Sequence, residues 1–242
     1  MSGARGRAGT SAVELLVALV LTAGLASLGW AVFAAHRRVA EGISRRADLL
    51  AAERVTRVVL ATETAAGAPG RDWDLLAPGV VTIRAFRGWA AVCAPLGRLR
   101  EGDDLFVSYE GLRQPEPDKD SVLSIEADGS WVVAALAWRT AAGEACPGTG
   151  GPALERWGTD PPLRDPILLR VFERGSYHLD DGALRYRIGA AGRQPLTPAA
   201  FDPRASGIGS APGQGLVLVL RGRDGLGGGW RRTLDGNGGG AP

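Results

Sequence analysis

The feature that most constrains this chain is an apolar run near its N-terminus. Residues 13–35, VELLVALVLTAGLASLGWAVFAA, contain a single charged side chain, Glu14. At about 1.5 Å of rise per residue, a helix of this length spans a hydrocarbon core of about 30 Å. A Gly-rich basic leader, MSGARGRAG, precedes the run, whereas a secretory signal carries its cleavage site after a shorter apolar stretch. We therefore expect a membrane-spanning helix that stays in the mature protein.

The helical pattern continues beyond the apolar run. Apolar residues recur at spacings of roughly three to four and larger multiples, with Arg and Glu between them, at Val39, Ile43, Leu50, Val55, Val58 and Val59. The pattern predicts one long helix, with a transmembrane half over 10–35 and an amphipathic half over 36–65. A membrane anchor followed by a separate helix, with a break near Gly42, is the alternative that the pattern leaves open.

The charge of the chain is nearly balanced. Its 242 residues carry a formal net charge of +2, and 45% of them are hydrophobic, which predicts a folded protein with a substantial core. A broad nucleic-acid-binding surface needs an excess of positively charged side chains clustered together, so the nearly balanced charge disfavours a nucleic-acid partner. Basic residues flank the apolar run on both sides, so the positive-inside rule does not decide its orientation.

After the helical region the sequence changes to short β-like runs separated by Gly, Pro and Asp. The candidate strands are 80–86, 89–93, 105–109, 121–125, 131–138, 167–174, 176–179, 183–188 and 215–222. Strands after one long helix, without alternating helices, predict an α+β domain over 66–235, whose antiparallel sheet packs against the helix. Residues 146–166 are expected to form a long irregular connection, and the tail 236–242 to be disordered.

Two dipeptides carry the turn chemistry of tight hairpins. Asp128-Gly129 and Asp181-Gly182 each lie between two candidate strands, where a tight reversal needs positive φ. Turn-rich strands of this kind suggest an exported domain, which would leave the N-terminus in the cytoplasm.

The two cysteines, Cys93 and Cys146, lie far apart and outside any CxxC or Cys/His cluster, so zinc ligation is disfavoured. In an exported domain we expect a disulfide between them, contributing roughly 2–4 kcal/mol.

Sequence patterns typical of catalysis are missing. The two histidines, His36 and His178, are isolated, and the chain has no GxSxG elbow, Walker loop or GxGxxG turn. The acidic pairs at 103–104, 118 and 120, and 180–181 fit turns, and their spacing is not that of an EF-hand. We therefore expect no enzyme activity, no metal and no cofactor. The tryptophans other than Trp30 are candidates for core packing, with some at a subunit interface.

The N-terminus resembles the class III signal of type IV prepilins and pseudopilins. A basic leader ends in Gly9, four small or apolar residues follow, and then Glu14 opens the apolar run. In that family a membrane prepilin peptidase cuts after the glycine and methylates the new amine, which implies cleavage between Gly9 and Thr10 and N-methylation of Thr10. The family usually has Phe after the cut in an FTLIE-like string, whereas this chain has TSAVE.

The resemblance also gives Glu14 a role. A carboxylate inside a membrane span costs about 2.5–3.5 kcal/mol unless it finds a partner. In the family the glutamate meets the N-terminal amine of a neighbouring subunit during assembly, and such a pair at Thr10 would fix axial register. The presence of Glu14 argues against the outermost subunit of a secretion pseudopilus, which lacks the acid. The alternative is an uncleaved single-pass anchor with a chance acid.

The resemblance implies a pilin-like fold and a non-catalytic minor pilin or pseudopilin. Residues 171–198 also resemble an aromatic hairpin of J- and W-type minor pilins and pseudopilins. The implied partners are prepilin peptidase, other pilins through helix packing, and the inner membrane. Before assembly the chain would cross the inner membrane once, with its C-terminal domain in the periplasm. After assembly it would lie in a pilus or secretion pseudopilus. Two alternatives remain. One is a DNA-uptake or adhesion module, which needs the Arg residues of 183–193 in one basic stripe. The other is an anchored periplasmic enzyme.

Overall fold

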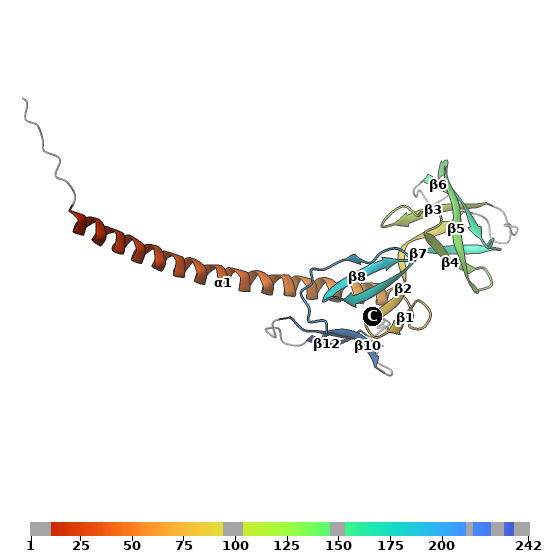
Figure 1. The fold of residues 1–242 in the computed structure, drawn as a ribbon. Coiled ribbons are helices and arrows are strands. Elements are labelled where there is room, and N and C mark those ends of the chain that lie inside the picture. Colours follow the sequence, from red (N-terminus) through yellow and green to blue (C-terminus); the bar gives the residue numbers. More distant parts are fainter. Residues whose placement is uncertain (1–10, 94–103, 146–152, 212–214, 224–229, 235–242) are drawn as a thin grey trace, which may run out of the picture. The chain divides into compact units, whose positions relative to one another are not determined.

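The computed structural model describes residues 11–93, 104–145, 153–211, 215–223 and 230–234. These residues form one helix and twelve strands (Figure 1). Their bounds are α1 (Ala12–Ala65), β1 (Trp73–Ala77), β2 (Val80–Val92), β3 (Leu105–Gly111), β4 (Asp120–Glu126), β5 (Trp131–Ala145), β6 (Ala153–Asp160), β7 (Pro166–Asp180), β8 (Ala183–Ile188), β9 (Gln194–Pro195), β10 (Gly207–Ala211), β11 (Gly215–Leu220) and β12 (Trp230–Leu234). The chain divides into two compact units, 1–48 and 49–242.

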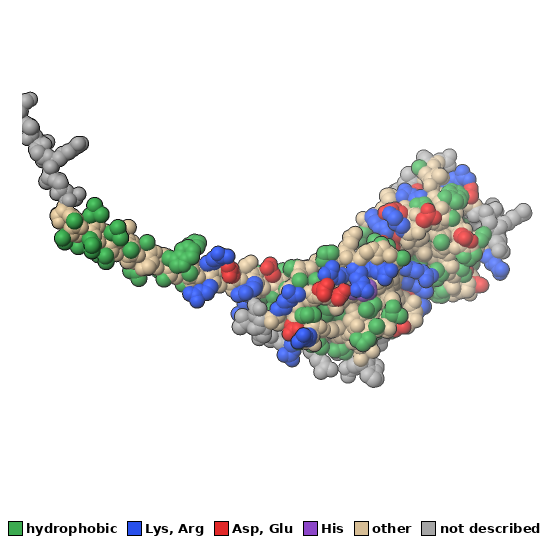
Figure 2. Space-filling view, in the orientation of Figure 1, with side chains coloured by type: hydrophobic (Ala, Val, Ile, Leu, Met, Phe, Trp, Pro, Cys, Tyr) green, Lys and Arg blue, Asp and Glu red, His purple; other side chains and the backbone are tan. Residues whose placement is uncertain are grey.

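The helix α1 is unbroken from Ala12 to Ala65, so the alternative break near Gly42 is wrong. Gly42 lies inside the helix and its missing side chain leaves open space. In the first unit, an 18-residue window of the helix has a mean hydropathy of 2.2, and none of it is buried. Figure 2 shows this part of α1 covered with hydrophobic side chains. By length and composition, the helix can cross a membrane.

The second unit contains an antiparallel sheet that closes on itself. The hydrogen-bonded order is β1-β2-β3-β6-β5-β4-β7-β8-β9, and β2 also pairs with β7. That additional pairing closes the six strands β2, β3, β6, β5, β4 and β7 into a ring. The general α+β class predicted from the sequence is confirmed, but the prediction of a simple sheet missed this barrel.

Two long strands belong both to the barrel and to the open part of the sheet. The sequence predicts two strands in place of each of them: 80–86 and 89–93 for β2, and 167–174 and 176–179 for β7. The structure shows single strands, and β2 carries a bulge between Phe86 and Gly88. Gly88 and Gly175, which look like strand breaks in the sequence, instead give room to tyrosine rings of neighbouring strands.

The two parts of the sheet enclose separate cores. The first lies between the C-terminal part of α1, the open sheet and the strands β10 and β11, and it includes Ala52, Leu60, Tyr177 and Phe201. The second fills the barrel around the fully buried Trp157. Packing of the helix against the open sheet agrees with the prediction, whereas the second core was not anticipated.

Both predicted Asp-Gly hairpins are confirmed. Gly129 has φ of 82° between β4 and β5, and Asp181 and Gly182 have φ of 52° and 75° between β7 and β8. The prediction of an irregular connection over 146–166 is wrong from Ala153 to Asp160, where β6 pairs with β3 and β5. The predicted disordered tail 236–242 lies outside the described residues.

Candidate functional site

The first turn of α1 is fixed by its own side chains. The Ser11 N–H donates to Glu14 Oε2 at 3.0 Å, and the Val13 N–H donates to Ser11 Oγ at 3.2 Å. The backbone carbonyl of Ser11 accepts from the Leu15 N–H, so Ser11 is the N-cap. This reciprocal pattern is similar to a capping box, with the Ser11 hydroxyl bonded at N2 instead of N3, and it satisfies donors that the helix leaves free. Its Ser-x-x-Glu spacing, at Ser11 and Glu14, is the signal that could have predicted this cap from the sequence.

The capping contact places the Glu14 carboxylate at the N-terminal end of the helix. Glu14 is exposed, and it is the only charged residue of the helix before Arg37. A carboxylate in the first turn also interacts favourably with the helix dipole. Gly9 and Thr10, the predicted cleavage and N-methylation residues, lie outside the described residues, so their predicted roles and the pairing of Glu14 with the Thr10 amine stay predictions.

In the second unit, α1 packs against the core through a stripe of small and medium side chains. The buried residues Ala52, Thr56, Leu60 and Thr64 recur at every fourth position, which places them on one face. Most of the apolar residues that predict the amphipathic half of the helix lie on another face. The side chains of Leu50, Val55 and Val58 are 58%, 38% and 53% exposed, respectively. The helix therefore has a second apolar face that the domain does not cover.

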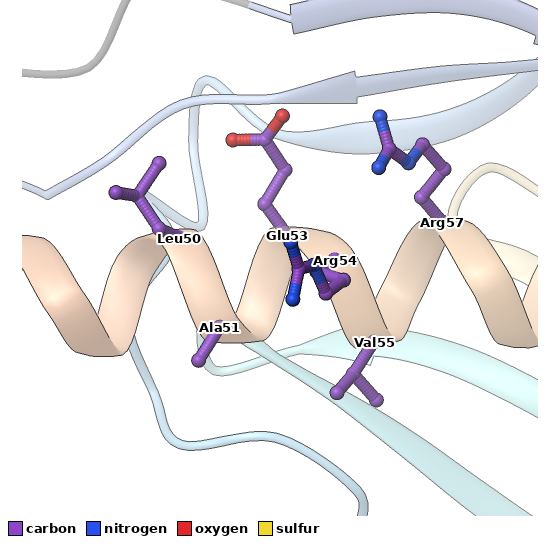
Figure 3. Close-up of a pocket in the computed structure, with 6 residues that line it drawn as sticks. All are labelled: Leu50, Ala51, Glu53, Arg54, Val55 and Arg57. Carbon is purple, nitrogen blue, oxygen red and sulfur yellow. The ribbon is translucent and has the colours of Figure 1, made fainter.

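A shallow groove of about 550 Å³ marks part of this uncovered surface (Figure 3). The described residues that line it all belong to α1 and are Leu50, Ala51, Glu53, Arg54, Val55 and Arg57. In Figure 3, Glu53 and Arg57 project from one side of the helix, and Ala51 and Val55 from the other. The surface thus combines apolar contact area with charges of both signs, as helix-packing surfaces do.

A buried ionic network joins the helix to both parts of the sheet. The bulged residue Arg87 donates to Glu63 of α1 at 2.9 Å and to Glu173 of β7 at 2.6 Å. Arg113 bridges Glu173 and Asp120 of β4, making two hydrogen bonds of 2.7 Å with the latter. The Arg87, Glu63 and Glu173 side chains are 15%, 14% and 6% exposed, so solvent screens these pairs weakly.

The pKa values in this network follow from its pairing. Burial opposes ionisation of Glu173, but hydrogen bonds from Arg87 and Tyr186 outweigh burial and hold its pKa below the ordinary value. Burial likewise opposes the charge of Arg87, and its bonds to Glu63 and Glu173 raise its pKa above the usual range. These charges are paired with one another, so the network holds the helix against the sheet.

The outer face of the open sheet carries a second concentration of charge. A groove of about 510 Å³ is lined in part by Arg71, Arg84, Arg174 and Arg187. Figure 2 shows Lys and Arg side chains gathered over β7 and β8 on this face. Of the Arg residues in 183–193 required by the basic-stripe alternative, Arg187 lines the groove, whereas Arg193 pairs with Asp180 at 2.8 Å.

The remaining predicted candidates have structural surroundings. His178 is buried in β7, with its Nε2 atom 2.8 Å from Ser176 Oγ. Cys93 follows β2, and Cys146 lies outside the described residues, so the predicted disulfide stays a prediction. Within the described ranges, no group of three or more His, Cys, Asp or Glu side chains is placed to hold a metal.

The tryptophans divide into two groups. Trp73 and Trp157 are buried, and the indole N–H of Trp73 donates to the carbonyl of Thr64 at 3.1 Å in the last turn of α1. The other tryptophans with described side chains in the second unit, Trp89, Trp131 and Trp138, are 45%, 46% and 38% exposed, respectively.

The fold and these sites define an α+β protein with an N-terminal helix able to span a membrane and a partly closed antiparallel sheet. Comparison of the chain with protein-family models, with curated proteins and with solved structures gave no match.

Proposed function

We propose that the chain is a non-catalytic subunit of a type IV filament, a minor pilin or pseudopilin that prepilin peptidase cuts after Gly9. The observation that carries the proposal is the lone carboxylate of Glu14 at the start of an exposed apolar helix. A simple anchor uses that charge only to cap its helix, whereas a helix that must align with its neighbours can also use it in a charge pair that fixes register.

Cleavage creates the partner for this carboxylate. The new amine at Thr10 adjoins Ser11, whose N–H already contacts Glu14. A neighbouring subunit that offers its own Thr10 amine would receive a carboxylate held at the helix terminus. Pairing of the two charges offsets part of the cost of each inside lipid. N-methylation of Thr10 would keep the positive charge.

The uncovered helix face supports the same proposal. Leu50, Val55 and Val58 remain exposed although the domain packs against another side of α1. Exposed apolar surface that continues along a helix marks a packing surface for another chain. In the proposed filament, helices of other pilins or pseudopilins cover it. Before assembly, the helix holds the protein in the inner membrane, with its second unit in the periplasm.

Processing is the first test. The full chain is expressed with a prepilin peptidase, and intact-mass and N-terminal peptide analysis compares wild type with Gly9→Ala. We expect a peptidase-dependent N-terminus at Thr10, with or without a methyl group, that Gly9→Ala abolishes. An N-terminus at Met1 or Ser2 in both proteins would refute the proposal and leave Glu14 as the capping residue of an ordinary anchor.

Assembly is the second test, with a matched pair of variants. Glu14→Gln removes the carboxylate of the first turn, and Glu110→Gln makes the same change at an exposed position of β3. We expect Glu14→Gln to abolish cross-linking to partner pilins in membranes while Glu110→Gln retains most of it. Equal cross-linking by both variants would contradict the proposed role of Glu14.

A further inference from the structure

The groove on the outer face of the open sheet has a defined set of strand positions. Side chains alternate across a strand, so Val81, Ile83 and Tyr177 enter the core while their sequence neighbours face outward. Arg84 of β2 lies opposite Arg174 of β7, and Ser176 of β7 lies opposite Arg187 of β8. All four of these outward-facing residues line the groove.

The register brings three guanidinium groups within reach of one another. Directly opposed residues have Cβ atoms about 4.5–5.5 Å apart, and diagonal neighbours are about 7–8 Å apart, within reach of long side chains. Arg84 and Arg174 are directly opposed, and Arg187 is diagonal to Arg174. Like charges in these positions destabilise a sheet unless an anion lies between them.

The three arginines differ in how their charge is satisfied. Arg84 donates to the buried carboxylate of Asp72 at 3.1 Å, and Asp72 also accepts from Arg71. Within the described residues, the guanidinium groups of Arg174 and Arg187 have no hydrogen bond or ion pair to another residue. The Nε atom of Arg187 is buried as well as unpaired. A buried donor without a partner costs roughly 1–3 kcal/mol. A bound ligand that accepts a hydrogen bond from Arg187 would remove this cost.

We propose that this groove binds a compact, multiply charged phosphate anion through Arg84, Arg174 and Arg187. Planar guanidinium groups suit phosphate because they form two parallel hydrogen bonds to its oxygens. The volume of about 510 Å³ is in the range of small-molecule sites.

The surrounding carboxylates confine the positive charge. Asp72 and Asp74 line the groove on the β1 side, and Asp180 neutralises Arg193 beyond β8. A long polyanion that extended past β1 or β8 would meet these carboxylates, whereas a compact anion can lie between the guanidinium groups of Arg84, Arg174 and Arg187. The inference does not depend on filament assembly.

Calorimetric titration tests the site on the full chain in detergent micelles, with inorganic tripolyphosphate as the probe. The variant Arg174→Gln/Arg187→Gln removes the two unpaired charges, and Arg204→Gln makes the same chemical change at an exposed position outside the groove. We expect saturable binding by wild type, a loss of at least about tenfold in the double variant, and no change in Arg204→Gln. Thermal unfolding of each protein verifies that the variants are folded.

Three results would overturn the inference. These are no saturable binding of tripolyphosphate by wild type, equal affinity in the double variant, and a similar loss in Arg204→Gln. A short oligothymidylate is titrated in parallel. If it binds more tightly than tripolyphosphate and depends on the same two arginines, the groove serves a phosphodiester polymer, and the compact anion is refuted as its ligand.

Discussion

At the scale of single residues, Arg87 links elements that are far apart along the chain. The bulge in β2 inserts an extra residue opposite β7, and this irregularity directs the Arg87 side chain toward Glu63 and Glu173. One guanidinium therefore connects the helix to the strand shared by both cores. The sequence did not indicate this network, because its members are far apart along the chain and charged residues are usually solvated.

Replacing Arg87 by Gln should destabilise the protein by about 3–5 kcal/mol, since buried carboxylates would lose their counter-charge. Urea unfolding of the full chain in detergent, followed by tryptophan fluorescence, measures the effect. Arg204→Gln, at an exposed position, should change stability by less than about 0.5 kcal/mol. Similar stability of the two variants would show that the network contributes little.

His178 reports on the charge of the outer sheet face. Burial lowers its pKa below 6.5, and the nearby charges of Arg193 and Arg187 lower it further. Arg187→Gln should therefore raise the pKa of His178, whereas Arg204→Gln should leave it unchanged. Titration of ring resonances by nuclear magnetic resonance measures both, with His36→Asn to assign the two histidines. An unchanged pKa in Arg187→Gln would mean that the guanidinium lies too far from the ring.

The sign of the accompanying stability change follows from linkage. The folded state binds a proton at His178 more weakly than the unfolded chain does. Between the folded pKa and the ordinary value of 6.5, stability therefore rises with pH, and it falls on acidification through this window. Arg187→Gln should raise the folded pKa of His178 toward 6.5. The pH range over which the free energy of unfolding depends on His178 should therefore become narrower, and the dependence weaker.

At the scale of elements, the sequence predicted those features that local chemistry determines. The long helix follows from its apolar content, and the hairpins at Gly129 and Gly182 follow from the need for positive φ. The strand β6 was missed because Gly and Pro surround it and it offers few large apolar side chains. Its pairing with β3 and β5 is long-range, and such tertiary context overrides local propensity.

The helix also shows how periodicity can identify the wrong face. The predicted apolar positions include Leu50, Val55 and Val58, but the domain packs against Ala52, Thr56, Leu60 and Thr64. Small residues and threonines bring the helix close to the sheet, and hydropathy alone ranks them below valine and leucine.

Paired truncations on the helix test this assignment of faces. Leu60→Ala should destabilise the domain by about 2–5 kcal/mol, because Leu60 is fully buried in the first core. Val58→Ala, on the uncovered face, should change stability by less than about 0.5 kcal/mol in the unassembled protein. Urea unfolding of the full chain in detergent compares the two. Equal losses would mean that Val58 is buried against the domain.

At the scale of the whole molecule, β7 decides when either core can begin to close. This strand contributes Tyr177 to the core against the helix and Leu169 and Val171 to the core of the barrel. Its pairing with β2 joins residues far apart along the chain, and such long-range contacts form late. Neither core can therefore close until the chain has emerged as far as Asp180. The strands that precede β7 keep their apolar side chains exposed until β7 has been synthesised. The nascent chain is therefore most susceptible to misfolding and proteolysis during that period.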